Sequence, residues 1–319
     1  QSASEAFDQD ETSLDMIAND FESNDLLSQR VWNDIPYGQV TSDGERVFML
    51  DDLREVELAS YGGINLRGTR PSDTRTNTLV ALDLSTEGKL LWLLGAGADQ
   101  QSSLTDAFFL GPPLPLDGRL YVMAEISGDI NLCCLDPATG NELWRQQVVA
   151  VESGGIQSDP IRRVAGATPT YHEGVLICPT GAGAIVAIDL ADRMLRWGVN
   201  YNRSMEMLRS VIGRGRGLDP SKLMQRWYSG AAIANEHSII VTPIEANELF
   251  GIDLLTGESL FESMDREQMR YVAGVRDGRF FVVGATRVRA YDLENGEEVW
   301  STLPNMLSAG QQICGYGMF

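Results

Sequence analysis

The sequence has few of the residues from which metal centres and disulfide frameworks are built. It contains two histidines and four cysteines in 319 residues. No Cys-x-x-Cys pair is present, and His172 and His237 stand directly before strand-like runs, in positions typical of turns. These numbers fit neither a disulfide-stapled domain nor a zinc site. We therefore predict that both histidines are turn residues.

Basic residues are also scarce, with 25 Lys and Arg against 45 Asp and Glu and a formal net charge of −20. A nucleic-acid-binding surface needs clustered Lys and Arg to neutralise phosphates, so we expect no nucleic-acid partner. No apolar run approaches the roughly 18 residues that cross a bilayer, so we expect no membrane span. The chain starts at Gln1 without a charged-then-apolar leader, and we interpret it as a processed or excised piece.

Two of the four cysteines are adjacent, and they lie in the apolar, strand-like run Ile130–Leu135. Successive side chains of a strand point to opposite faces, so a bond between Cys133 and Cys134 would require a distorted peptide. We predict that they are two small buried side chains. A vicinal disulfide is the alternative.

Five segments of the chain repeat one pattern: an apolar run, an Asp, a polar turn that usually contains Gly, an apolar residue and an aromatic residue. The segments are Leu79–Trp92, Leu132–Trp144, Val186–Trp197, Phe250–Phe261 and Val288–Trp300. Their Asp and aromatic residues are Asp83 and Trp92, Asp136 and Trp144, Asp189 and Trp197, Asp253 and Phe261, and Asp292 and Trp300. Because an active site rarely needs five copies, we predict structural roles: the Asp holds a turn and the aromatic residue packs between neighbouring units.

A second polar turn followed by a β-rich run precedes each segment, which makes four short strands per unit. Units of roughly 50 residues with four strands are typical of propeller blades. We predict an all-β fold, a β-propeller of four-stranded antiparallel blades with five recognisable repeats. Residues Leu303–Phe319 look like the start of a sixth blade, and we expect a larger propeller that continues beyond Phe319.

The repeat resembles the quinoprotein-like (PQQ-type) repeat, whose hallmark is Ala-x-Asp-x-x-Thr-Gly-x-x-x-Trp. The stretch from Leu135 to Trp144 is nearest to that form, with Asp136, Thr139 and Gly140 in place. The resemblance covers residues 31–319. It implies the fold of a family whose propellers usually have eight blades, and it extends to the lipoprotein group that assists outer-membrane barrel assembly. Residues 1–30, with eight acids and one base, are predicted to be an acidic leader or linker.

Long insertions indicate where binding takes place. They fall near residues 51–77 and 198–230, in connectors that open on the same face of a four-stranded meander. Nearly half of the 25 basic residues lie in such connectors. We predict that this face binds an acidic partner or an anionic ligand through Arg162, Arg163, Arg209, Arg214 and Arg216. The alternative is that these arginines are solvated or pair with the acidic body of the protein.

Three functions are compatible with a propeller of this kind. A hydrolytic propeller such as a sialidase is disfavoured, because Ser-x-Asp-x-Gly-x-x-Trp boxes are missing. A PQQ-dependent dehydrogenase-like quinoprotein, with PQQ and calcium as cofactors, is the alternative that the resemblance keeps open. The adjacent pair Cys133-Cys134 favours it, since enzymes of the family often place a vicinal disulfide over the cofactor, but no calcium-ligand set or haem-attachment motif is recognisable.

We therefore predict a non-catalytic scaffold that binds protein partners on its long-loop face. The resemblance implies a location in the periplasm or another space of the bacterial cell envelope. No catalytic, metal-binding or cofactor-binding residue is assigned.

Overall fold

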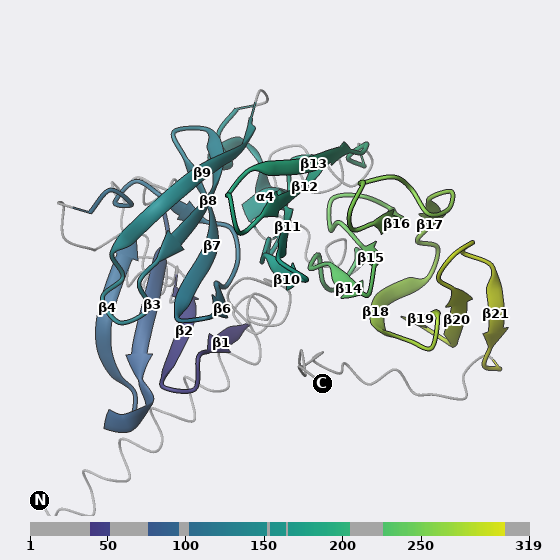
Figure 1. The fold of residues 1–319 in the computed structure, drawn as a ribbon, viewed down its shortest axis with the longest axis horizontal. Helices are drawn as coiled ribbons and strands as arrows, with labels where there is room; N and C mark the ends of the chain where they lie inside the picture. The colour runs from purple at the N-terminus through teal and green to yellow at the C-terminus, as the bar shows by residue number, and fades with distance from the viewer. Residues whose placement is uncertain are drawn as a thin grey trace, which may run out of the picture.

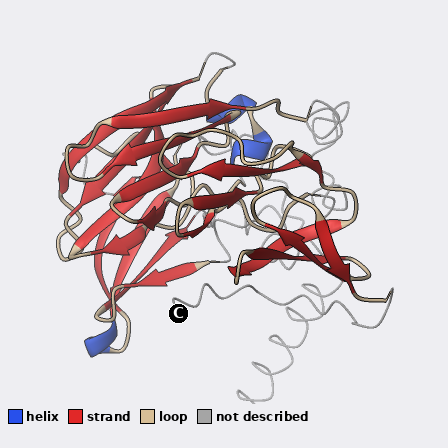
Figure 2. Cartoon of the chain, turned by 45° about the vertical axis from the view of Figure 1, so that its right-hand side comes forward, coloured by secondary structure: helices blue, strands red, loops and turns tan. Residues whose placement is uncertain are grey.

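The computed structural model describes residues 39–51, 76–95, 102–151, 154–163, 165–204 and 226–303. Within these residues the strands form five antiparallel sheets that follow one another along the chain. Figure 1 shows the sheets standing side by side in chain order, from the purple and blue end of the chain to the yellow end. In the described part of the chain, helix is limited to a few short segments, drawn blue in Figure 2. The predicted all-β fold of four-stranded antiparallel blades is confirmed.

Each sheet is one blade, and its strands run outward from the first to the last. Blade 1 contains β1 (Val40–Ser42), β2 (Arg46–Asp51), β3 (Thr78–Asp83) and β4 (Lys89–Gly95). Blade 2 contains β5 (Phe108–Phe109), β6 (Leu114–Leu116), β7 (Arg119–Ile126), β8 (Asp129–Leu135) and β9 (Glu142–Ala150). Blade 3 contains β10 (Thr170–His172), β11 (Val175–Pro179), β12 (Ala184–Asp189) and β13 (Leu195–Asn200). Blade 4 contains β14 (Ile233–Asn235), β15 (Ser238–Val241), β16 (Glu248–Asp253) and β17 (Met264–Asp265). Blade 5 contains β18 (Met269–Arg276), β19 (Arg279–Gly284), β20 (Val288–Asp292) and β21 (Glu298–Ser301).

Three short helical segments complete the described elements. They are η1 (Leu84–Thr86), η2 (Ile156–Ser158) and α4 (Pro160–Arg163). Blade 2 differs from the others because its innermost strand is divided into β5 and β6, both of which pair with β7. The division falls at Pro112 and Pro113, which cannot donate to a strand ladder. Residues 1–38 and 304–319 lie outside the described residues, so the acidic leader and the partial sixth blade stay predictions.

The hydrophobic core lies between neighbouring blades. Four clusters of buried side chains each join two consecutive sheets. Strands in the middle of a blade are therefore apolar on both faces, as in β8, where six consecutive residues from Ile130 are buried. The innermost strands β10, β14 and β18 contact one another in sequence. This arrangement is that of propeller blades stacked face to face.

The two adjacent cysteines point into different cores. Both thiols are free and fully buried. Cys133 belongs to the cluster between blades 1 and 2, and Cys134 belongs to the cluster between blades 2 and 3. The prediction of two small buried side chains is confirmed.

Burial raises the pKa of Cys133 and of Cys178 to about 12, and it also raises the pKa of Cys134. The reactive thiolate is therefore rare in the folded protein at a pH of about 8. In a Cys314→Ser variant, which removes the cysteine outside the described residues, we expect no thiol to react with Ellman's reagent until denaturant is added. Colour should then develop from all three remaining thiols. Fast reaction without denaturant would show that at least one of these sites opens readily.

The repeated Asp holds its turn in every blade. In each copy Oδ1 accepts a hydrogen bond from the backbone N–H two residues further on, at 2.8–2.9 Å. The turn amides of Thr139 and Thr256 make further bonds of this kind and hold the pKa of Asp136 and Asp253 below the usual range. A carboxylate that accepts several backbone amides favours its charged form, so the turn and the charge support each other.

The repeated aromatic residue docks on the turn of the next blade. Trp92 Nε1 donates to the backbone oxygen of Pro137 at 3.0 Å, and Trp197 Nε1 donates to that of Leu254 at 2.8 Å. Each acceptor follows directly after the repeated Asp of the next blade. The indole ring lies so close to the Gly of that turn that a Cβ on Gly257 would stand 2.7 Å from Trp197 Cγ.

Blade 3 replaces this Gly with Arg193, which adopts the same left-handed backbone with φ 62°. Its guanidinium carbon lies 5.1 Å from the centre of the Trp144 ring of blade 2. A cation over an indole face is attractive, so the arginine takes over the docking contact. Trp300, in the outermost strand of blade 5, is 41 % exposed.

Candidate functional site

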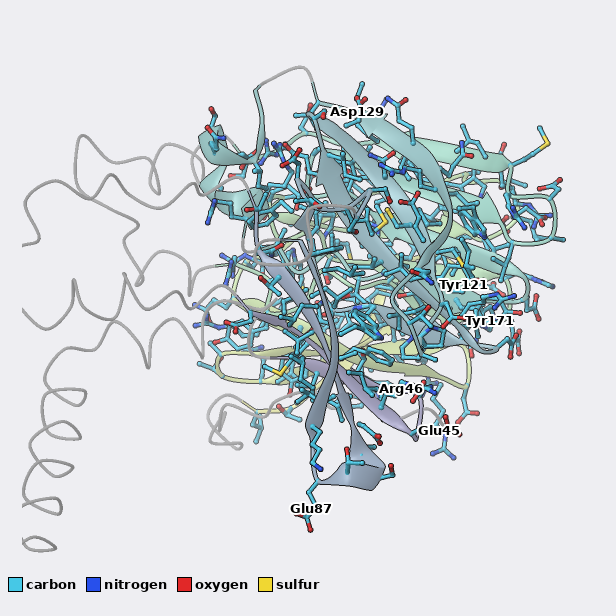
Figure 3. The ribbon with its side chains drawn as sticks, turned by 90° about the vertical axis from the view of Figure 1, so that its left-hand side faces the viewer. Glu45, Arg46, Glu87, Tyr121, Asp129 and Tyr171 are labelled. Atoms are coloured by element: carbon cyan, nitrogen blue, oxygen red, sulfur yellow. The ribbon has the colours of Figure 1, made fainter. Side chains whose placement is uncertain are left out.

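The connectors between blades and those between second and third strands meet at one end of the propeller. We call this end the connector face and the opposite end, which carries the other turns, the hairpin face. In Figure 3, Asp129 beside the β7–β8 turn and Glu45 and Glu87 of the hairpin face mark opposite ends of the sheets. The described parts of the connector face include residues 154–163, 165–169, 180–183, 201–204, 226–232, 242–247 and 266–268.

A buried arginine joins two connectors on this face. The side chain of Arg162, in α4, is 1 % exposed. Its Nε donates to Glu125 Oε2 at 2.8 Å, and its Nη1 donates to Asp159 Oδ2 at 2.9 Å. The remaining amino group reaches the backbone oxygen of Gly154 at 3.2 Å. Glu125 lies near the end of β7, so this contact ties the second strand of blade 2 to the connector that leads to blade 3.

The network continues into the next connector. Asp159 also accepts a hydrogen bond from Arg203, whose Nη2 lies 2.9 Å from Oδ1, so one carboxylate bridges two guanidinium groups. Glu125 uses its other oxygen to accept the backbone N–H of Ile156 at 2.6 Å. Two acids and two bases are thus paired inside the protein. Breaking one pair would leave a charge without its partner, which is far more costly than an exposed ion pair.

A second buried acid links blades 3 and 4. Glu245 is 2 % exposed and accepts hydrogen bonds from the hydroxyl of Tyr201 and from the backbone N–H of Gly183. Burial and the negative charge of Glu245 raise the pKa of Tyr201 well above its usual value, so the phenol stays a proton donor. The backbone N–H of Ser204 donates to the backbone oxygen of Glu245 at 2.8 Å. The connectors of three successive blades are therefore fixed to one another by polar contacts.

The structure separates the five arginines that the sequence analysis singled out. Arg162 lies inside the protein, where it pairs with Glu125 and Asp159 as the alternative interpretation described. Arg163 is half-buried, with its guanidinium carbon 5.1 Å from the centre of the Phe108 ring. Consecutive residues of a helical turn differ in direction by about 100°, so one side chain points in and the next points away. The others lie outside the described residues: Arg209, Arg214 and Arg216.

The sequence analysis did not single out a pair of basic residues on the shortest connector between blades. Arg266 and Arg270 flank the short connection from β17 to β18. The search followed long insertions, and this connection is the shortest between blades. The signal that could have found them is a pair of arginines four residues apart where a strand begins a blade.

One family of known proteins matches the chain. The family described as outer membrane protein assembly factor BamB matches residues 30–214 and 75–260. The chain belongs to this family. A comparison with curated proteins finds no match.

Solved structures of BamB and of quinoproteins resemble this fold. BamB from Moraxella catarrhalis has 17% sequence identity and a TM-score of 0.45, over 72% of this chain and 59% of that chain. Quinohemoprotein alcohol dehydrogenase from Comamonas testosteroni has 16% identity and a TM-score of 0.43, over 71% of this chain and 40% of that chain. The chain thus spans less than two thirds of the length of either protein.

Among the described residues, no group of three or more His, Cys, Asp or Glu side chains could hold a metal ion. His172 and His237 lie at hairpin turns, where His172 Nε2 is 3.0 Å from the backbone oxygen of Glu236. None of the described helices is both long and apolar enough to cross a bilayer.

Proposed function

We propose that this protein is a non-catalytic scaffold of the bacterial cell envelope that binds another protein on its connector face. The observation that carries the proposal is the buried network of Glu125, Asp159, Arg162 and Arg203. Removing these charges from water costs free energy that an apolar core would not cost. The buried charges hold the connectors rigidly in place. This rigidity is useful where the connectors present a binding surface, which explains why the cost is tolerated.

Membership of the BamB family supports the location and the kind of partner. The family is described as an outer membrane protein assembly factor. We infer that the partner is a protein of the envelope and that the scaffold acts in the periplasm or at the outer membrane. The dehydrogenase alternative loses the feature that favoured it, because Cys133 and Cys134 face separate cores and cannot form a cover over one cofactor.

Photo-crosslinking in living cells tests this proposal. The crosslinking residue p-benzoylphenylalanine replaces Gln157 or Asn202, two exposed residues of the connector face. The matched controls replace Glu87 or Asp277, which are exposed on the hairpin face. We expect one discrete adduct from the connector-face positions and none from the controls, and mass spectrometry should identify an envelope protein in it. Adducts from both faces alike, or from the hairpin face alone, would argue against the proposal.

A further inference from the structure

Two connectors meet at the junction of blades 4 and 5. The backbone N–H of Tyr228, in the connector that leads to blade 4, donates to the backbone oxygen of Arg270, the second residue of β18, at 2.9 Å. The rings of Tyr228 and Tyr271 stack with their centres 6.4 Å apart. The guanidinium carbon of Arg270 lies 5.4 Å from the centre of the Tyr228 ring. All three side chains are half-buried, so they form a flat, partly apolar surface at the connector face.

Arg266 lies beside this surface with one donor unused. Its Nη1 donates to the backbone oxygen of Met269 at 3.2 Å, which holds the guanidinium in place. Its Nε is buried and has no hydrogen-bond partner. Buried donors in folded proteins are almost always paired, so an unpaired one requires an explanation.

The surroundings of Arg266 are also short of negative charge. Burial and the nearby positive charge of Arg270 lower the pKa of Arg266, and the opposing influences are those of Asp265 and Tyr228. The chain as a whole carries 45 acids against 25 bases, so a pair of neighbouring arginines is not a result of composition. Elsewhere on the same face the buried arginine Arg162 is matched by two carboxylates. Among the described residues, no carboxylate forms an ion pair with Arg266 in this way, and a carboxylate of a partner protein can supply that charge.

The composition of the surface fits a protein partner. Tyr and Arg are enriched where protein interfaces gain most of their binding energy, because both combine a large flat contact area with hydrogen-bond donors. A guanidinium group binds a carboxylate in the plane of its donors, and the bond strengthens where water is excluded.

We propose that Tyr228, Arg266, Arg270 and Tyr271 bind an acidic peptide segment of the partner protein. A carboxylate of the segment pairs with the guanidinium groups of Arg266 and Arg270, and an adjacent apolar side chain lies against the two tyrosine rings. This inference rests on the proposed function, because it names the chemistry that the connector face recognises.

Fluorescence anisotropy tests the site with two short labelled peptides, one of alternating Glu and Leu and one of alternating Gln and Leu. We expect the wild-type protein to bind the Glu peptide at least about tenfold more tightly than the Gln peptide. The double variant Arg266→Gln, Arg270→Gln should lose about tenfold or more of the affinity for the Glu peptide. The matched control is Arg276→Gln, Arg279→Gln, which removes the same charge from the other end of blade 5 and should change the affinity less than about twofold.

Several results would overturn the site. They are equal binding of the two peptides, no binding of either, an unchanged affinity in the double variant, or the same loss in the control. Inorganic phosphate at matched ionic strength should not displace the peptide. If it does, the site is a general anion site and the peptide assignment is wrong.

Folding is checked independently, because the arginine pair is not expected to stabilise the free protein. The melting temperature of Arg266→Gln should equal or exceed that of the wild type. The variant lacks the buried, unpaired Nε of Arg266 and the repulsion between the charges of Arg266 and Arg270. If Arg270→Gln disturbs folding through its contact with Tyr228, the single variant Arg266→Gln carries the test with Arg276→Gln as its control.

The crosslinking experiment separates the two proposals. Suppose that the variant Arg266→Gln, Arg270→Gln binds the Glu peptide as tightly as the wild type and still gives the adduct from Gln157. The peptide site is then wrong and the scaffold proposal stands. If no connector-face position gives an adduct in the wild type, the scaffold proposal itself fails.

Discussion

Replacing Arg162 by methionine should lower the free energy of unfolding by about 3–5 kcal/mol. The guanidinium is the partner of Glu125, which is 3 % exposed and accepts its other hydrogen bond from the backbone of Ile156. Asp159 would keep Arg203, but Glu125 would be left as a buried charge without a counter-ion. The change should also loosen the connector between blades 2 and 3, because the bond to the backbone of Gly154 is lost.

Chemical denaturation of the variant and of two companions measures this effect. Arg163→Met is the matched control, because the neighbouring arginine is half-buried and lies over the Phe108 ring, and it should cost about 1 kcal/mol. Adding Glu125→Gln to Arg162→Met should restore part of the stability, since the uncompensated charge is then removed. An Arg162→Met protein as stable as the control would mean that the buried network does not hold the connectors.

Replacing Gly257 by alanine should lower the free energy of unfolding by about 2–4 kcal/mol. The residue has φ +75°, which costs alanine free energy wherever it occurs. In addition, the new Cβ would stand 2.7 Å from Trp197 Cγ, so the indole would have to move. That movement would disturb the hydrogen bond from Trp197 Nε1 to the backbone oxygen of Leu254. The docking contact between blades 3 and 4 would be weakened.

Gly174→Ala is the control that separates strain from docking. Gly174 has φ +82° in the turn between β10 and β11, and a Cβ there would meet nothing within 4 Å. It should cost about 1 kcal/mol, the backbone contribution alone. Thermal or denaturant unfolding of both variants gives the difference, which is the docking contribution. In a Trp197→Ala background the extra cost of Gly257→Ala should fall to that of the control. Equal losses for the two glycines in the wild type would show that the indole yields without cost.

The fold could be predicted because its signal is local and repeated. The Asp, the turn and the aromatic residue recur within a few residues of one another, and hydrogen bonds between neighbours such as Asp136 and Ala138 determine the turn. The alternation of side chains along a strand predicted in the same way that Cys133 and Cys134 point to opposite faces. This alternation is local and requires no knowledge of the rest of the chain.

The site could be predicted only in outline. Insertion lengths indicated the connector face, but not which arginines it presents. Arg162 was expected at the surface and is buried, because its pairing with Glu125 joins residues 37 positions apart that meet only when blade 2 is formed. Arg193 was not expected in a docking role, since the repeat places Gly at its position in the neighbouring blades.

The amino-acid sequence by itself determined the repeat, the strand order within each blade and the end of the sheets at which the connectors gather. Contacts between residues close in sequence decide these features. Tertiary structure alone decided which charges are paired. Arg162 finds two carboxylates, whereas Arg266 lies beside Arg270 with an unused donor, and nothing in their sequence neighbourhoods distinguishes these outcomes. The physical reason is that charge pairing depends on distance and burial, and both are set by how successive blades stack.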